Sequence, residues 1–159
     1  MEYEKACFGA GCFWGVQSAF DELKGVVSSE VGFMGGSVKL NTKEPYHLVC
    51  SGVTGYAEVV FIKFDKNLIS YEELLNKFFE LHDPTQLDRQ GPDVGSQYRS
   101  VVFYYNKEQE KSTLNYIKNN QKNFKRKIVT QVIPASDFYK AEEYHQKYLA
   151  KKGLSSCHI

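Results

Sequence analysis

Apolar side chains recur along the chain at two spacings, one typical of helices and the other of strands. Phe13, Val16 and Phe20 follow the helical spacing. Ser70 and Glu73 have the spacing of a capping box, which predicts the start of another helix. Together these patterns predict helices over residues 13–23, 70–81, 107–121 and 142–150.

Short runs rich in β-branched and aromatic residues predict strands between these helices. They lie at residues 5–9, 26–33, 57–64, 101–105 and 128–133. The irregular alternation of the two kinds of element indicates an α+β fold, a two-layer sandwich in which helices pack on a mixed sheet. The length fits a single domain over residues 1–159 with a flexible C-terminal tail at 151–159.

Two long segments, residues 36–55 and 82–97, are rich in glycine and polar residues and are predicted to be loops. Long irregular stretches in a compact domain usually carry function. Tyr46 lies in the first segment, and Tyr56 and Tyr98 directly follow the first and the second. One such tyrosine is more often a packing residue than a hydroxyl donor, whereas several on loops beside a candidate acid favour a site.

Cys12 is the leading candidate for a reactive nucleophile. It comes directly before the first predicted helix, and Trp14, the only tryptophan, follows two positions later. The backbone N–H groups and the dipole of a helix N-terminus both favour a thiolate. Gly11 lets the chain turn tightly before the thiol. An arbitrary cysteine is more often a small buried hydrophobe, but the flanking glycines and aromatics favour a reactive thiol here.

Glu58 is a candidate proton donor. Alternation along the strand at 57–64 places it on the same face as Val60, Ile62 and Phe64. A carboxyl group on an apolar face has its neutral form favoured by desolvation, which suits a general acid. The alternative is that Glu58 lies at the strand end with its carboxylate in water.

The other cysteines divide into two kinds. Cys157 lies in a small, polar C-terminal tail, where a mobile thiol could attack an oxidised Cys12 and form a disulfide; an accidental exposed cysteine is the alternative. Cys7 and Cys50 lie beside apolar residues and are expected to be inert structural thiols. The cysteine spacings match no zinc module, so no metal is expected.

Composition excludes several classes of partner. Twenty basic and nineteen acidic residues give a formal net charge of +1, so no global field attracts nucleic acid or a membrane. No signal sequence stands at the N-terminus, and no apolar run approaches the roughly 20 residues of a membrane helix. We therefore expect a soluble, cytoplasmic monomer that uses its cysteines for thiol chemistry.

Several motifs in order along the chain resemble those of the peptide methionine sulfoxide reductase A family. The resemblance covers nearly the whole chain, from about Cys7 to Cys157. The motifs, quoted as they stand here, are GCFWG at 11–15, GFMGG at 32–36, YHLVCSG at 46–52, TGYAE at 54–58, HDPTQ at 82–86, GSQYRS at 95–100 and EYHQKYL at 143–149.

The resemblance implies a ferredoxin-like α+β sandwich that reduces methionine S-sulfoxide, free or in proteins, and so repairs oxidative damage. It implies that Cys12 is the nucleophile, Glu58 the acid and Cys157 the resolving cysteine. The remaining roles fall to Tyr46 and Tyr98 as donors to the sulfoxide oxygen, Phe13 and Trp14 as the methyl pocket, and Asp93 as a residue that orders the site. No bound cofactor is implied; thioredoxin, or dithiothreitol in vitro, would be the external reductant.

Two positions depart from the family pattern, and other functions remain as alternatives. Tyr56 stands where the family often has His, and Phe33 where it often has Tyr, which affects the rate or the pocket shape rather than the reaction. A cysteine hydrolase would have no use for Cys157. A non-enzymatic sensor of methionine oxidation would not turn over with dithiothreitol. A peroxide-reducing thiol enzyme would not need Trp14 beside a methyl group.

Overall fold

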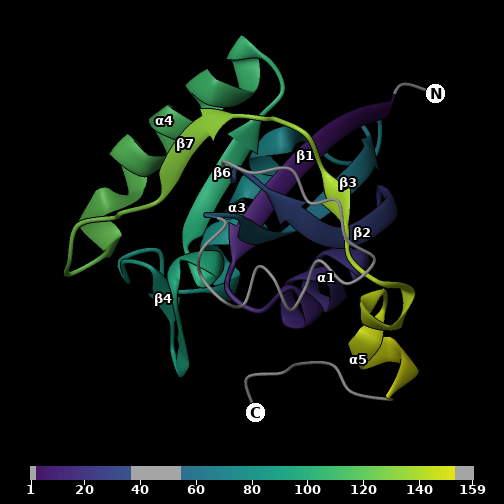
Figure 1. Cartoon of the computed structure of the whole chain (residues 1–159). Coiled ribbons are helices and arrows are strands. Elements are labelled where there is room, and N and C mark those ends of the chain that lie inside the picture. Colours follow the sequence, from purple (N-terminus) through teal and green to yellow (C-terminus); the bar gives the residue numbers. More distant parts are fainter. Residues whose placement is uncertain (1–2, 37–54, 153–159) are drawn as a thin grey trace.

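A six-stranded mixed sheet forms the centre of the molecule (Figure 1). The computed structural model describes residues 3–36 and 55–152. The strand order is β7-β6-β1-β3-β2-β8; β6 and β7 are parallel, and every other neighbouring pair is antiparallel. The strands are β1 (Tyr3–Ala10), β2 (Val26–Met34), β3 (Ala57–Asp65), β6 (Ser100–Tyr104), β7 (Gln131–Pro134) and β8 (Tyr139–Lys140).

Helices cover one face of this sheet. They are α1 (Phe13–Asp21), α3 (Tyr71–Leu81) and α4 (Lys107–Asn120), and the short α5 (Tyr148–Lys151) packs against α1. The main core lies between α1, α3 and the sheet, where Phe8 stacks on Phe20 and on Phe78 with ring centroids 5.2 Å apart in both cases. Side chains alternate along β1, so Phe8 points to this core while the neighbouring Cys7 belongs to the core on the opposite face. The sequence prediction of an α+β fold with helices on a mixed sheet is confirmed.

The capping box predicted before α3 is present. Ser70 Oγ accepts a hydrogen bond of 3.1 Å from Glu73 N, and Glu73 Oε1 accepts one of 3.3 Å from Ser70 N. These two bonds satisfy backbone donors that the first turn of the helix leaves without intrahelical partners. The local sequence therefore fixes where α3 begins.

The loop predicted at residues 82–97 contains regular structure that the sequence analysis missed. It holds a two-stranded hairpin of β4 (Arg89–Gln90) and β5 (Asp93–Val94), followed by the 3-10 turn η1 (Ser96–Tyr98). Strands of two residues are too short to show an alternating pattern, so no periodicity marks them. The predicted loop at 36–55 lies almost wholly outside the described residues.

The predicted helix at residues 142–150 is wrong. The chain there forms a 3-10 turn, η3 (Glu143–His145), and then the four-residue α5. The two are separated because Lys147 has a φ of 56°, in the left-handed region, which ends any continuous right-handed helix. The strand predicted at 128–133 begins only at Gln131. A further 3-10 turn, η2 (Gln121–Asn123), directly follows α4.

No helix within residues 3–36 and 55–152 is long and apolar enough to cross a lipid bilayer.

His82 joins three elements at the C-terminal end of α3. Its Nδ1 lies 2.5 Å from Phe78 O, and its Nε2 lies 2.8 Å from Ser100 Oγ. Since a carbonyl oxygen only accepts, Nδ1 carries the proton, and in the neutral ring Nε2 accepts from Ser100, whose oxygen is also 2.8 Å from Thr130 Oγ1. Burial lowers the pKa of His82 to about 4, against an ordinary value of 6.5, although the bond to Phe78 partly opposes this.

We predict that His82 makes the protein less stable as the pH falls from about 6.5 to about 4. In this window the unfolded chain binds a proton at His82 that the native state does not, so the free energy of unfolding decreases by up to about 3 kcal/mol. Urea denaturation across this range, for the wild type and for His82→Gln, would measure the effect. The amide cannot titrate, so the variant should show a shallower decrease; equal slopes would contradict the assignment.

Candidate active site

Cys12 occupies the N-cap position of α1, at the end of the chain segment that leaves β1. The turn depends on Gly11, whose φ of 92° is one that residues with a Cβ rarely adopt. A Cβ added at Gly11 would also lie 2.9 Å from Gln90 Cβ, so the hairpin of β4 and β5 packs directly against the turn. Cys12 itself is partly buried, and the helix dipole of α1 directs its positive end toward this position.

The carboxyl group of Glu58 lies beside the same helix N-terminus. Glu58 is 1% exposed, and its Oε1 accepts a hydrogen bond of 3.2 Å from Phe13 N, the backbone group next to Cys12. Glu58 stands on β3 opposite Phe33 of β2. The side chain is therefore held between two paired strands and a helix start, and the alternative of a carboxylate in water does not apply.

A cluster of aromatic and aliphatic residues lies beside this pair. It contains Phe13, Val31, Phe33, Tyr56 and Ala141, with Trp14 and Tyr139 packed against it. The rings of Phe13 and Phe33 are 5.7 Å apart between centroids. Both positions that depart from the family pattern, Phe33 and Tyr56, thus belong to the apolar wall next to the thiol.

Trp14 is held by a segment more than a hundred residues later in the chain. Its Nε1 donates a hydrogen bond of 3.0 Å to His145 Nδ1, and its indole stacks on Tyr148 with centroids 3.9 Å apart. His145 is 1% exposed and also packs against Phe13. His145 and Tyr148 lie in the EYHQKYL motif at 143–149, and nothing in the local sequence beyond this motif indicates that they contact Trp14.

Tyr98 and Asp93 both lie on the segment that follows α3. Asp93 pairs with Gln90 across the β4–β5 hairpin, and Gln90 is the residue that packs against Gly11. Gln90 is itself fixed by two hydrogen bonds to the backbone of Asp83, of 2.8 and 2.9 Å. Tyr98 ends the turn η1, which lies against β3, the strand that carries Glu58. The hairpin and the turn therefore border the thiol turn and the carboxyl-bearing strand.

The remaining predicted residues fall into two groups. Tyr46, Cys50 and Cys157 lie outside the described residues. Cys7 is fully buried in the sheet, opposite Phe61 of β3 and Phe103 of β6, and burial raises the pKa of its thiol, which keeps it protonated. Among the described residues, no group of three or more His, Cys, Asp or Glu side chains is placed to hold a metal ion.

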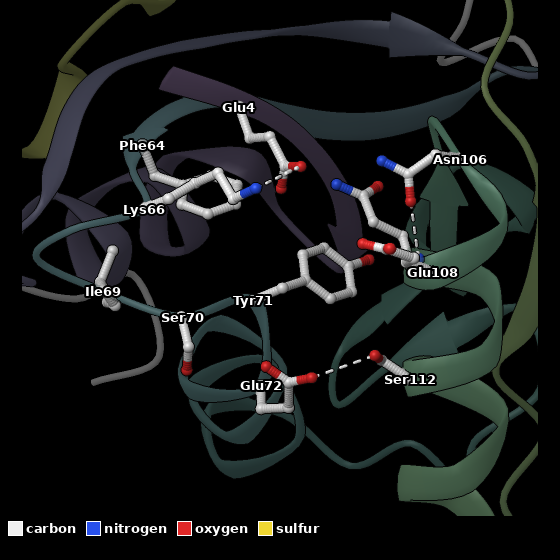
Figure 2. A pocket seen from close by; sticks show the side chains of 11 residues that line it. Glu4, Phe64, Lys66, Ile69, Ser70, Tyr71, Glu72, Asn106, Glu108 and Ser112 are labelled. Carbon is white, nitrogen blue, oxygen red and sulfur yellow. Dashed lines mark hydrogen bonds and ion pairs between the residues drawn. The ribbon is translucent and has the colours of Figure 1, made fainter. Parts of the chain in front are cut away.

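A separate hollow of about 200 Å³ lies between the N-terminal ends of α3 and α4 (Figure 2). Its wall includes Glu4, Tyr71 and Glu108. Glu4 is at the start of β1, whereas Cys12 follows the end of that strand at Ala10, which is about 20 Å from Glu4 along the strand direction. This hollow is not part of the thiol site.

The sequence profile described as "Peptide methionine sulfoxide reductase" matches residues 4–159. The peptide methionine sulfoxide reductase MsrA of Methanothermobacter thermautotrophicus is 50% identical over 159 residues, which cover 99% of this chain and 92% of that protein.

Solved structures agree with the sequence comparison. The reduced form of Mxr1 from Saccharomyces cerevisiae superposes with a TM-score of 0.90 at 34% identity, covering 96% of this chain and 87% of that one. The structure of Mxr1 in complex with Trx2 has a TM-score of 0.66 at 23% identity, covering 92% of this chain and 85% of that one, and supports the fold alone.

These findings define the class of protein as an oxidoreductase that acts on methionine sulfoxide. The chain belongs to the peptide methionine sulfoxide reductase MsrA family, and its activity is that of a peptide-methionine (S)-S-oxide reductase. The hydrolase and the non-enzymatic sensor are thereby set aside.

Proposed function

We propose that Cys12 and Glu58 carry out the reduction of methionine S-sulfoxide, free and in proteins, as a repair of oxidative damage. One observation carries the proposal: the Glu58 carboxyl group accepts a hydrogen bond from Phe13 N, directly after Cys12 at the start of α1. A nucleophile at a helix N-terminus and a buried carboxyl group one residue away are the two groups that sulfoxide chemistry requires.

The reaction begins with a proton from Glu58 to the sulfoxide oxygen, which makes the substrate sulfur electrophilic. The Cys12 thiolate attacks that sulfur and a sulfur–sulfur bond forms; the oxygen takes up a second proton, equivalent to the one that the thiol gave up, and leaves as water when the sulfur–oxygen bond breaks. A water molecule then attacks the Cys12 sulfur and loses a proton, which returns to Glu58, while the sulfur–sulfur bond breaks and methionine leaves with its electron pair. The sulfoxide gains two electrons, the thiol loses two, and Cys12 is left as a sulfenic acid.

The other candidate residues bind and orient the substrate in this proposal. Tyr46 and Tyr98 donate hydrogen bonds to the sulfoxide oxygen, and Asp93 helps to order them. Phe13 and Trp14 receive the substrate methyl group. The contacts of the Trp14 indole with His145 and Tyr148 support this role, because they hold the ring in one orientation beside the thiol.

Cys157 attacks the sulfenic acid and forms a disulfide with Cys12, which thioredoxin then opens. The resemblance of the chain to Mxr1, whose complex with Trx2 has been solved, supports thioredoxin as the reductant. Dithiothreitol would replace it in vitro. None of these steps needs a metal, flavin or nicotinamide in the site.

The proposal also extends to the fold type and setting of the enzyme. Apart from the β4–β5 hairpin and η1 between α3 and β6, the order is β1-α1-β2-β3-α3-β6, and with neighbours β6-β1-β3-β2 in the sheet it supports a ferredoxin-like core. We assign residues 1–159 to one catalytic domain that acts as a monomer. We place it in the cytoplasm, since a thiol cycle of this kind needs a reducing compartment.

Replacing the acid tests the first step. Glu58→Gln should slow sulfenic acid formation by roughly 10²–10⁴-fold, because the amide can still bond to the oxygen but delivers no proton. Rapid-quench measurement of methionine released in a single turnover would give the rate. Glu22→Gln, at the C-terminal end of the same helix, is the matched control and should leave the rate unchanged. An unchanged rate in Glu58→Gln would move the acid role to another group.

The two proposed redox cysteines should fail at different steps. Cys12→Ser should abolish even a single turnover, because a hydroxyl is a far poorer nucleophile at neutral pH. Cys157→Ser should release about one methionine per enzyme and then stall with thioredoxin, while dithiothreitol partly rescues it. Mass spectrometry of the wild type after sulfoxide should find a Cys12–Cys157 disulfide. A stable bond from Cys12 to Cys7 or Cys50, with Cys157 reduced, would refute the pairing.

A further inference from the structure

Beyond the short strand β8, the side chain of Gln146 makes the hydrogen bonds to the edge strand β2 that a longer β8 would have made. The pairing of β2 with β8 ends at Gly32 and Lys140, and Ala141 N then donates to Val31 O over 3.0 Å. The side-chain amide of Gln146 takes over: its Oε1 accepts from Val31 N and its Nε2 donates to Val31 O, both over 2.9 Å. Gln146 is 6% exposed, and losing it would remove the partner of the buried Val31 N–H, whereas Val31 O would keep its bond from Ala141 N.

The next residue fastens the same segment to α1. Lys147 N donates to Gln17 Oε1 over 2.7 Å, and Lys147 Nζ donates to Asp21 Oδ2 over 2.6 Å and to Ser29 Oγ over 2.8 Å. Gln17 is 1% exposed and also donates from Nε2 to Ser29 O. Lys147 adopts its left-handed φ in this arrangement, so the contacts also fix the direction in which α5 leaves.

Together the side chains of Gln146 and Lys147, with their partners on α1 and β2, form what we call the C-terminal clamp. The chain beyond it runs through α5, where Tyr148 stacks on Trp14, two residues after Cys12. Cys157 stands five positions after Lys152, the end of the described segment. The clamp thus ties the start of the tail to the helix that Cys12 begins.

We propose that the C-terminal clamp is a positioning device for disulfide formation: it anchors the tail so that the Cys157 thiol stays concentrated near oxidised Cys12. This rests on the proposed role of Cys157. In the step concerned, the Cys157 thiolate attacks the Cys12 sulfur, the sulfur–sulfur bond forms, and the sulfur–oxygen bond breaks. The departing hydroxide takes up a proton, so one water leaves and no other oxidant is needed.

The gain from anchoring follows from the length of the tether. The effective concentration of a tethered group falls as roughly the −3/2 power of the linker length. If the clamp opened fully and the contacts of His145 and Tyr148 with Trp14 were lost with it, the last backbone contact with β2 would be at Ala141, and the tether to Cys157 would grow from about five residues to about sixteen. Disulfide formation would then slow by about sixfold, while attack on the sulfoxide would be unaffected.

The test uses the double variant Gln146→Ala/Lys147→Met in the full chain. After one equivalent of methionine sulfoxide peptide, quenching with dimedone reports the sulfenic acid and mass spectrometry reports the disulfide. We expect methionine release within about twofold of the wild type and disulfide formation slowed by about two- to sixfold. Lys151→Met is the matched control, because its ammonium group bonds to Glu143 O within the same segment. The single variant Lys147→Arg keeps the positive charge that pairs with Asp21, and it should form the disulfide at the wild-type rate.

An insertion of about twelve Gly and Ser residues after Lys152 tests the anchor with the clamp intact. It should slow disulfide formation by about sixfold in the wild type but only about twofold in the double variant, whose tether is already long. If the double variant does not fold, the insertion alone decides: a twofold effect in the wild type would place the anchor upstream of the clamp and overturn the proposal.

The remaining outcomes are equally decisive. Wild-type rates of disulfide formation in the double variant would show that the clamp does not position the tail. An equal slowing of both steps would mean that Gln146 and Lys147 support the Trp14 pocket instead. Absence of any Cys12–Cys157 disulfide in the wild type would overturn the resolving role of Cys157 itself, and with it the function of the clamp.

Discussion

The hydrogen bond from Phe13 N to the buried Glu58 carboxyl group is the interaction on which the rest of the site depends. It joins the first residue of α1 to β3, and β3 lies between β1 and β2 in the sheet. The chain reaches Cys12 directly from β1. The separation of thiol and carboxyl is therefore set by strand pairing and by one tight turn, which are among the stiffest features of a small domain. A reaction that needs both groups at once benefits from this rigidity.

A second set of contacts ties the C-terminal part of the chain to the same helix. His145 and Tyr148 hold the Trp14 indole, and the clamp residues hold the backbone that carries them. Cys12 therefore lies at the N-terminal end of α1, and the clamp residues contact the side of the same helix. This arrangement places both halves of the proposed thiol cycle on one structural element.

The sequence predicted the parts of the fold that rest on local signals. The apolar spacing of α1, the alternation in β3 and the capping box at Ser70 each reflect interactions within a few residues. The break at Lys147 and the strand β8 were missed because they depend on contacts with β2 and α1, over a hundred residues away. The same applies to the Trp14–His145 bond, which spans 131 positions. The candidate thiol and acid could be named from sequence, but their proximity required the register of the sheet.

Stereochemistry tests the central claim most directly, because a fixed thiol, acid and methyl pocket accept only one arrangement about the substrate sulfur. In the proposed site, with the methyl group beside Trp14, only one epimer can direct its oxygen to Glu58, and the activity of the family makes this the S epimer. A peptide with racemic methionine sulfoxide, incubated with the enzyme and dithiothreitol and resolved by chromatography, should lose only the S epimer. Equal loss of both epimers would contradict the account.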